Sequence, residues 1–262
     1  MEAVERISDA LKGRTIVVTR PQEQAESLCR AIEQRGGTAL RFPVIGIGPL
    51  ADRSEIERVA GRLDTFDLAF FVSPNAVRYA LDGLLVARDW PASLRVATVG
   101  KGSERALAAR GFGRVIAPES GFDSESVLAL PAFAPEAVRG RRILVLRGDG
   151  GRDLLGETLV ARGAEVEYLS CYRRFCPDIE PDRLLDPVRR GEVDGLLLSS
   201  SEGARNLADI VGAAGMELLS DVPVFASHPR IAAQCRELGF ARVIETGAGD
   251  EGALRTIISY FG

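Results

Sequence analysis

The stretch AEVEYLSCYRRFCP (Ala164–Pro177) decides how we interpret this chain. It begins like an ordinary β-strand, because Val166, Tyr168 and Ser170 recur at the alternate positions typical of a strand. It ends in an arginine-rich run that is closed by a proline. A strand with such a polar tail is expected where the chain leaves one domain and returns to another. We therefore expect this stretch to carry Tyr172 to a cleft between two domains.

The segments before this stretch predict an α/β architecture. Thr15–Thr19 is a short, β-branched apolar run typical of a buried parallel strand, and Gln22–Arg35 repeats apolar residues near the helical period. Further strands are expected at Thr38–Phe42, Asp67–Val72, Arg95–Val99 and Arg114–Ala117, with helices near Ser54–Arg62, from Ser73 onward, and from Gly100 to Arg110. Short strands joined by helical crossovers favour a parallel sheet with helices on both faces.

The sequence also repeats itself. Ile16 aligns with Ile143 at an offset of 127 residues (143 − 16), and Ser73 aligns with Ser200 at the same offset (200 − 73). The run GFGRVIAPESG, which starts at Gly111, matches GFARVIETGAG, which starts at Gly239. In both copies the second strand runs into a tail that is polar or broken by glycine and proline, and VIGIGPL in the first copy is too rich in both for a central strand. Two such copies predict two domains, and the repeat alone would place their boundary near residue 135.

Composition and charge exclude several classes of protein. The net charge of −4 and the lack of a lysine or arginine block argue against nucleic-acid binding. The four cysteines form no CxxC pair and have no histidine at metal-ligand spacing, so no metal site and a reducing, cytoplasmic location are expected. No signal peptide and no apolar run of about 18 residues is present, so no membrane association is expected.

Several motifs, taken in order, resemble the uroporphyrinogen-III synthase family. They are VVTRP at residues 17–21, FFVSPNAV at 70–77, VATVGKGS at 96–103, ILVLRGDGGRD at 143–153, LLLSSSEGARNL at 196–207 and VFASHPR at 224–230. The resemblance covers residues 15–250. It implies two flavodoxin-like, doubly wound parallel-sheet α/β domains joined by a two-stranded linker. Residues 1–42 and 173–262 would form domain 1, residues 43–172 an inserted domain 2, and the linkers would lie at about 41–47 and 168–176, which displaces the boundary near 135.

The resemblance also implies an activity. A member of this family is a lyase of tetrapyrrole and haem biosynthesis that closes hydroxymethylbilane into uroporphyrinogen III. The reaction loses water and inverts ring D through a spiro intermediate, with no cofactor and no metal. A cytoplasmic monomer is expected, and a transient contact with the preceding enzyme of the pathway is allowed. The competing interpretation is a non-catalytic two-domain clamp or sensor for a small anionic ligand; a DNA-binding regulator is disfavoured by the acidic charge.

The substrate implied by the resemblance carries eight carboxylates, so helix N-termini and arginines at strand ends are the expected binding groups. These candidates are Arg20, Ser73, Pro74, Asn75, Gly100, Lys101, Arg147, Gly148, Arg152, Ser200, Ser201, His228 and Arg230. At each of these corners, plain helix capping is the alternative. Glu202 puts the corner at Ser200 and Ser201 in question, because it adds a negative charge there.

The resemblance places the functional tyrosine of the family at Tyr172. Its hydroxyl would donate a hydrogen bond to the departing hydroxyl of the bilane. A phenol is a poor acid near neutral pH, so we expect Tyr172 to orient and polarise the leaving group. The alternative is a linker tyrosine that only packs. His228 is the only histidine of the chain, and whether it shares in proton transfer stays open.

Overall fold

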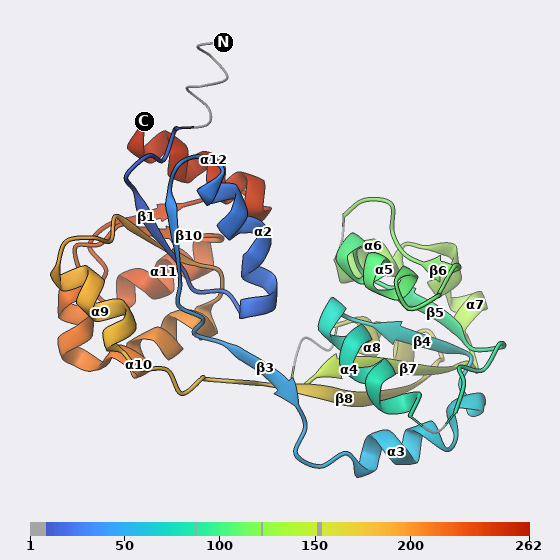
Figure 1. Ribbon diagram of the computed structural model, residues 1–262. Coiled ribbons are helices and arrows are strands. Elements are labelled where there is room, and N and C mark those ends of the chain that lie inside the picture. The colour runs from blue at the N-terminus through green and yellow to red at the C-terminus, as the bar shows by residue number, and fades with distance from the viewer. Residues whose placement is uncertain (1–8, 87, 122, 151–153) are drawn as a thin grey trace. The chain divides into compact units, whose positions relative to one another are not determined.

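The structure is a computed structural model that describes residues 9–86, 88–121, 123–150 and 154–262 (Figure 1). It consists of two compact units. Unit 1 holds the described residues up to Gly46 together with Phe175–Gly262, and unit 2 is Ile47–Arg174. The position near residue 135, where the repeat alone would place a boundary, lies inside unit 2. That boundary is therefore wrong.

Unit 1 is a parallel α/β unit. Its elements are β1 (Thr15–Val18), α2 (Gln22–Glu33), β2 (Thr38–Arg41), α9 (Asp182–Arg189), β9 (Gly195–Leu198), α10 (Ser201–Leu219), β10 (Val224–Ala226), α11 (Pro229–Glu237), β11 (Val243–Glu245) and α12 (Gly249–Phe261). The sheet has the order β11-β10-β9-β1-β2, and its neighbouring strands pair in parallel. If these five strands are renumbered 1 to 5 in chain order, the sheet is 5-4-3-1-2. Read from the other edge, this is the flavodoxin-like order 2-1-3-4-5.

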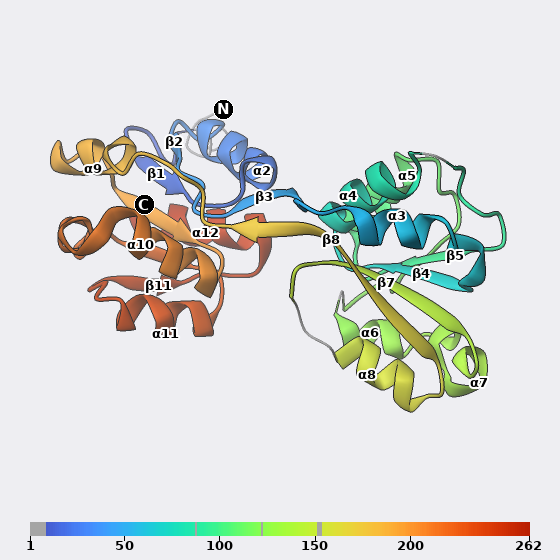
Figure 2. The same cartoon turned by 90° about the horizontal axis from the view of Figure 1, so that it is seen from below.

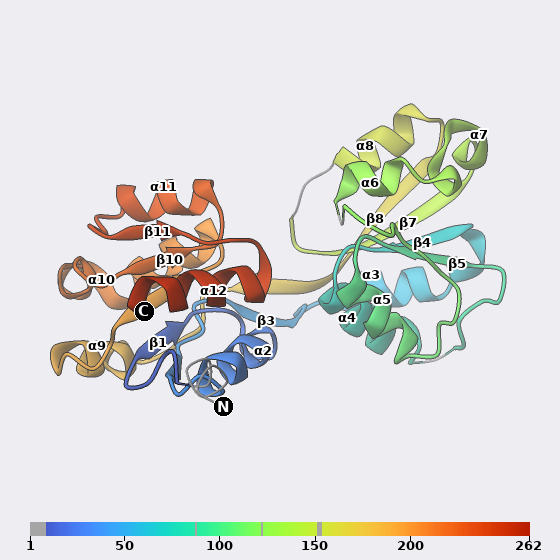
Figure 3. The ribbon, with the colours of Figure 1, turned by 90° about the horizontal axis from the view of Figure 1, so that it is seen from above.

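The core of unit 1 lies on both faces of this sheet. Ile16, Val17 and Val18 of β1 are all fully buried, as expected for a central parallel strand that is covered from both sides. Figure 3 shows α2 and α12 on one face and α10 and α11 on the other. On the first face, Leu28 of α2 and Ile257 of α12 belong to one hydrophobic cluster with Ile16 and Val18.

Unit 2 repeats this plan. Its elements are β3 (Gly46–Pro49), α3 (Ser54–Ala60), β4 (Leu68–Phe71), α4 (Pro74–Leu84), β5 (Arg95–Thr98), α5 (Lys101–Ala108), β6 (Val115–Ile116), α6 (Ser124–Leu128), α7 (Pro135–Val138), β7 (Arg142–Gly148), α8 (Leu154–Ala161) and β8 (Glu165–Phe175), with single 3-10 turns at Leu63–Thr65 and Pro131–Phe133. Two of these strands, β3 and β8, each extend by one residue, Gly46 and Phe175, into unit 1. The sheet order is β3-β8-β7-β4-β5-β6. With β7 and β8 counted first, the order is again 2-1-3-4-5, and the glycine- and proline-rich β3 is added at the edge, where such residues are tolerated.

Helices cover both faces of the sheet of unit 2. Figure 2 shows α3, α4 and α5 on one side of the sheet and α6, α7 and α8 on the other. Alternate residues of each strand serve the two cores: Phe71 packs toward α3 and α4, whereas its neighbour Phe70 packs toward α6 and α8. We call these the α4 face and the α8 face.

Strand pairing explains the sequence repeat. β1, β2, β9, β10 and β11 hold the same places in the first sheet as β7, β8, β4, β5 and β6 hold in the second. The first two strands of each copy therefore join the last three strands of the other copy. The expected fold class, two flavodoxin-like α/β domains with a two-stranded linker, is confirmed, because β3 and β8 are neighbouring strands and lie where the chain passes between the units.

β8 differs from its expected form. We expected the strand to end near Ser170 in a polar tail, but it continues to Phe175 and is a neighbour of β3 in the sheet. It also contains a β-bulge: Arg147 pairs with Ser170 and the next residue, Gly148, pairs with Tyr172, so Cys171 is the extra residue. The bulge places both Cys171 and Tyr172 on the α4 face.

Candidate functional site

Three of the predicted residues cap helices at the carboxyl ends of strands. Ser73 Oγ accepts a hydrogen bond from the Ala76 amide at 3.1 Å and begins α4, and Ser200 Oγ accepts from the Gly203 amide at 2.9 Å and begins α10. His228 Nδ1 accepts from the Arg230 amide at 3.1 Å and begins α11. His228 and Arg230 are both exposed. The local cap signals in the sequence therefore located these corners.

Arg20 lies at the carboxyl end of β1, as expected, but it already has partners in unit 1. Its Nε donates to Ser199 Oγ at 3.0 Å, and its Nη1 forms an ion pair with Asp250, in the first turn of α12. The arginine side chain is only 15% exposed. Sequence reasoning missed Asp250, because the two residues lie 230 positions apart and no local pattern links them.

Ser201 directly follows the capping residue Ser200, and the hydrogen bonding of its hydroxyl is unusual. Its Oγ is buried and has no hydrogen-bond partner among the described residues. A buried hydroxyl without a partner costs about 1–3 kcal/mol. Of the predicted residues that the structure describes, Ser201 therefore has the strongest local reason to bind a ligand atom or a water molecule.

Tyr172 lies in the core of the α4 face of unit 2. Its side chain is 3% exposed, and its hydroxyl oxygen is 3.1 Å from Ser73 Oγ, where either atom could be the donor. Its ring lies against the ring of Tyr79, with centroids 5.8 Å apart. The Tyr79 hydroxyl in turn donates to the Ile47 carbonyl at 3.2 Å. Tyr172 is therefore a packed tyrosine whose polar end reaches the N-terminus of α4.

Gly148 provides the other surface that contacts the Tyr172 ring. A Cβ atom at Gly148 would lie 2.7 Å from Cε2 and Cζ of Tyr172 and 3.1 Å from its hydroxyl oxygen. Next to Tyr172, burial raises the pKa of the Cys171 thiol to about 12, so this thiol stays protonated near neutral pH and is no nucleophile. The glycine that we assigned to substrate binding thus has a direct steric role.

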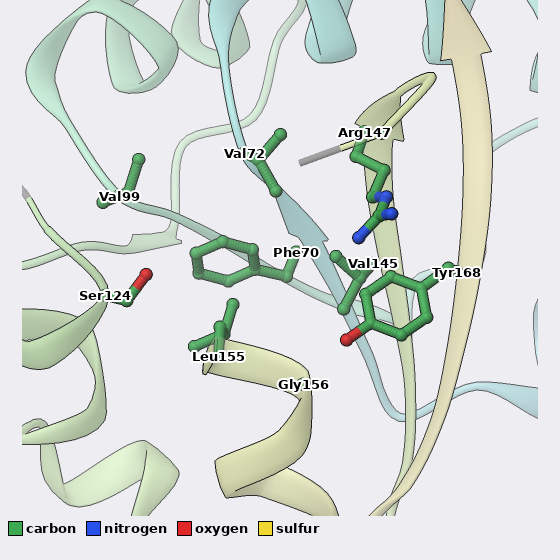
Figure 4. Close-up of a pocket in the computed structure, with 10 residues that line it drawn as sticks. Phe70, Val72, Val99, Ser124, Val145, Arg147, Leu155, Gly156 and Tyr168 are labelled. Atoms are coloured by element: carbon green, nitrogen blue, oxygen red, sulfur yellow. The ribbon is translucent and has the colours of Figure 1, made fainter. Parts of the chain in front are cut away.

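Arg147 lies on the other side of the sheet. It lines a cavity of about 180 Å³ on the α8 face with apolar residues that include Phe70, Val145 and Leu155 (Figure 4). The Arg147 guanidinium carbon lies 4.6 Å from the centre of the Tyr168 ring, in a cation–π contact. Arg147 and Tyr172 are therefore not brought together, although they are near neighbours in the paired strands.

The remaining candidates divide among three places. Pro74 and Asn75 form the first turn of α4, and Asn75 is buried. Gly100 begins α5 without a side-chain cap, and Lys101 Nζ forms an exposed ion pair with Glu104 at 2.9 Å. Arg152 lies outside the described residues. Within the described residues no group of three or more histidine, cysteine and acidic side chains could hold a metal ion, and no helix there is long and apolar enough to cross a membrane.

Comparison with known sequences finds one family. The sequence pattern of a family described as "Uroporphyrinogen-III synthase HemD" matches residues 26–254. The uroporphyrinogen-III synthase of Escherichia coli K12 is 31% identical over 244 residues, which cover 92% of this chain and 98% of that protein. That of Proteus mirabilis is 34% identical over 183 residues, which cover 70% of this chain and 91% of that protein.

Solved structures show the same fold. A mutant uroporphyrinogen III synthase of Thermus thermophilus aligns with a TM-score of 0.57 and 20% identity, covering 95% of this chain and 98% of that one. The uroporphyrinogen-III synthetase of Helicobacter pylori 26695 aligns with a TM-score of 0.58 and 13% identity, covering 94% and 99%. The structural likeness agrees with the sequence matches, and by those matches this chain belongs to the uroporphyrinogen-III synthase family.

Proposed function

We propose that this chain closes the linear tetrapyrrole hydroxymethylbilane into uroporphyrinogen III. Family membership supports the proposal, because the uroporphyrinogen-III synthase of Escherichia coli aligns with 92% of this chain. The enzyme is accordingly a cyclising lyase of tetrapyrrole biosynthesis. In the reaction, the bond between the hydroxymethyl carbon and its oxygen breaks and the oxygen leaves as water. The substituted carbon of the terminal ring attacks the resulting cation and forms a spiro intermediate. The original bond from that carbon to its methylene group then breaks, the methylene group joins the free carbon on the other side of the ring, and a proton is lost, which leaves ring D inverted.

Within this reaction, Tyr172 assists the departure of water. A hydrogen bond from its phenol to the leaving hydroxyl would stabilise the oxygen as the carbon–oxygen bond lengthens. The position of the phenol at the N-terminus of α4 supports this role, since ligands of open α/β sheets bind at the carboxyl ends of strands. Most of the catalytic effect would be geometric, because the enzyme must hold the ring for attack at the position that leads to inversion.

The helix N-termini of both units would bind the carboxylates of the substrate. The first turn of α10, with the unpartnered Ser201 hydroxyl, and the first turn of α11, which begins at His228, are the contributors from unit 1. The first turns of α4 and α5 are the contributors from unit 2. Each such contact contributes roughly 0.3–2 kcal/mol, so several together are needed to hold a flexible octacarboxylate.

We further propose that the protein works in the cytoplasm as a monomer, without cofactor or metal. Its two units would serve as the two domains, connected at about residues 41–47 and 168–176. A transient contact with the preceding enzyme would transfer the unstable bilane. The chemistry supports the lack of a cofactor, because loss of water from the bilane requires neither oxidation nor reduction.

Product analysis tests the proposal. The purified protein is incubated with hydroxymethylbilane, and the isomers of uroporphyrinogen are separated after oxidation to uroporphyrins. We expect the inverted isomer III. A mixture that holds only the uninverted isomer I, the product of unassisted closure, would instead support the non-catalytic clamp.

A further inference from the structure

The sequence repeat supplies an internal comparison for Ser73. Its counterpart at the offset of 127 is Ser200, and the two serines cap α4 and α10 in the same way, at 3.1 and 2.9 Å from the capped amides. Capping is therefore common to the two copies. It explains why a serine is present at both positions, and it does not explain any difference between them.

The copies differ in what approaches this cap. The offset places Ile45 at the position equivalent to Tyr172 (172 − 127). Gly203 lies in the first turn of α10, and a Cβ atom placed on it would lie 3.6 Å from Ile45 Cδ1. An apolar side chain therefore packs against this turn of the helix. In unit 2, the phenol of Tyr172 occupies the corresponding place and reaches Ser73 Oγ at 3.1 Å.

A neighbouring helical position binds the backbone of residues 44–47 in both copies, although the two acceptors are not equivalent by the offset, since Val44 corresponds to Cys171 (44 + 127). Tyr79 of α4 donates to the Ile47 carbonyl at 3.2 Å, and Asn206, its counterpart in α10 (79 + 127), donates to the Val44 carbonyl at 2.8 Å. Both copies thus use the same helical position to hold the segment at 44–47. The hydrogen bond between Tyr172 and Ser73 is an addition in one copy that the common fold does not require.

The surroundings of the Tyr172 ring show what this addition contributes. Gly148 and Tyr79 lie against the ring and fix its position by packing. Packing does not fix the rotation of the phenolic hydrogen about the carbon–oxygen bond. Ser73 Oγ accepts from the Ala76 amide, so its own hydrogen is available to donate to the Tyr172 oxygen. In that arrangement the phenolic hydrogen points away from Ser73 and can be donated elsewhere.

We propose that Ser73 is a positioning residue that orients the hydroxyl of Tyr172 for donation to the leaving hydroxyl of the substrate. The helix N-terminus at α4 strengthens this effect, because the amide bonded to Ser73 Oγ polarises the serine hydroxyl and makes it a better donor. The inference rests on the proposed function of Tyr172. It goes further in assigning Ser73 to Tyr172 and not to a carboxylate of the substrate.

A double-mutant cycle tests this assignment with Ser73→Ala, Tyr172→Phe and the double variant. We expect Ser73→Ala to lower kcat about 5- to 20-fold, the effect of one lost hydrogen bond, and to change KM less than about 2-fold. The double variant should have the kcat of Tyr172→Phe. Ser73→Thr, which keeps the hydroxyl and the cap, should restore kcat to within about 2-fold.

Asp123→Ala is the matched control. Asp123 caps α6 in the same unit, accepting from the Ser126 amide at 2.8 Å, and it lies outside the candidate site. This variant should lose a cap and keep its kcat. The assignment is overturned if the two losses of kcat multiply in the double variant. It is also overturned if Ser73→Ala mainly raises KM, or if Asp123→Ala loses as much kcat as Ser73→Ala.

A spectroscopic measurement separates this inference from the proposed function. The chain contains four tyrosines, and with ¹³Cζ-labelled tyrosine the NMR signal of Tyr172 is identified by its loss in Tyr172→Phe. Ser73→Ala should move that signal, whereas Asp123→Ala should not. If the wild-type protein makes no isomer III, the proposed function fails, yet the signal still tests the bond. An unmoved signal in Ser73→Ala overturns the assignment whatever the activity.

Discussion

Gly148 offers a sharp test of how Tyr172 is held. In Gly148→Ala, the new Cβ would lie 2.7 Å from two ring carbons of Tyr172. Carbon atoms pack best at about 3.5–4.0 Å, so the ring would have to retreat by roughly 1 Å. Its other side is occupied by Tyr79, so the ring cannot retreat freely. A shift of that size also breaks the 3.1 Å hydrogen bond to Ser73.

The expected cost follows from this geometry. Gly148 is not among the glycines with positive φ, so alanine can adopt its backbone conformation and the effect comes from overpacking alone. Overpacking in a dense core costs about 1–3 kcal/mol of the free energy of unfolding. We expect unit 2 to lose this stability, and kcat to fall at least as far as in Ser73→Ala, because the Tyr172 hydroxyl leaves its position.

The chain contains a built-in probe for this measurement. Trp90 is its only tryptophan and packs against Phe71 and Phe112 in the α4-face core of unit 2. Urea unfolding followed by Trp90 fluorescence therefore reports on unit 2. Gly113→Ala is the control, since a Cβ there would meet nothing within 4 Å. If Gly148→Ala unfolds at the urea concentration of this control and keeps full activity, the account of Tyr172 packing is refuted.

Two further predictions concern charge and reactivity. Asp67 accepts hydrogen bonds from the Arg142 backbone amide and the Arg141 guanidinium, which hold its pKa below the usual 3.8. The ionised carboxylate therefore stabilises the fold above pH 3.8. This contribution is lost as the pH falls through the lowered pKa. Asp67→Asn should accordingly destabilise unit 2 at pH 7, and urea unfolding should show the difference from wild type shrinking below about pH 4. A thiol reagent at pH 8 should label the exposed Cys176 long before the buried Cys171. Mass spectrometry of the peptides measures the order of labelling. Labelling of Cys171 before Cys176 would contradict this prediction.

Local signals in the sequence were sufficient for the fold and for many corners of the site. Short β-branched runs such as Thr15–Thr19 identified the parallel strands, and serines before Pro74 and before Ser201 identified helix starts. The offset of 127 residues linked the two copies. These features depend on residues close together in the chain, where propensity and capping act directly.

Contacts between distant residues could not be predicted. The bulge at Cys171 arises from pairing between β7 and β8, and it turns Tyr172 toward α4. The hydrogen bond between Tyr172 and Ser73 joins residues 99 positions apart, and the ion pair of Arg20 with Asp250 joins residues 230 apart. No periodicity or motif encodes such pairs. They follow from the register of the sheets, which is fixed only when the strands pair.

The inversion of ring D is the central claim, and the isomer composition of the product measures it most directly. Hydroxymethylbilane is incubated with increasing amounts of the protein, with heat-denatured protein as the control, and isomers I and III are separated. The account predicts that isomer III replaces isomer I as the amount of native protein rises, while the control yields isomer I. A product that remains isomer I at every amount of folded protein would contradict the account.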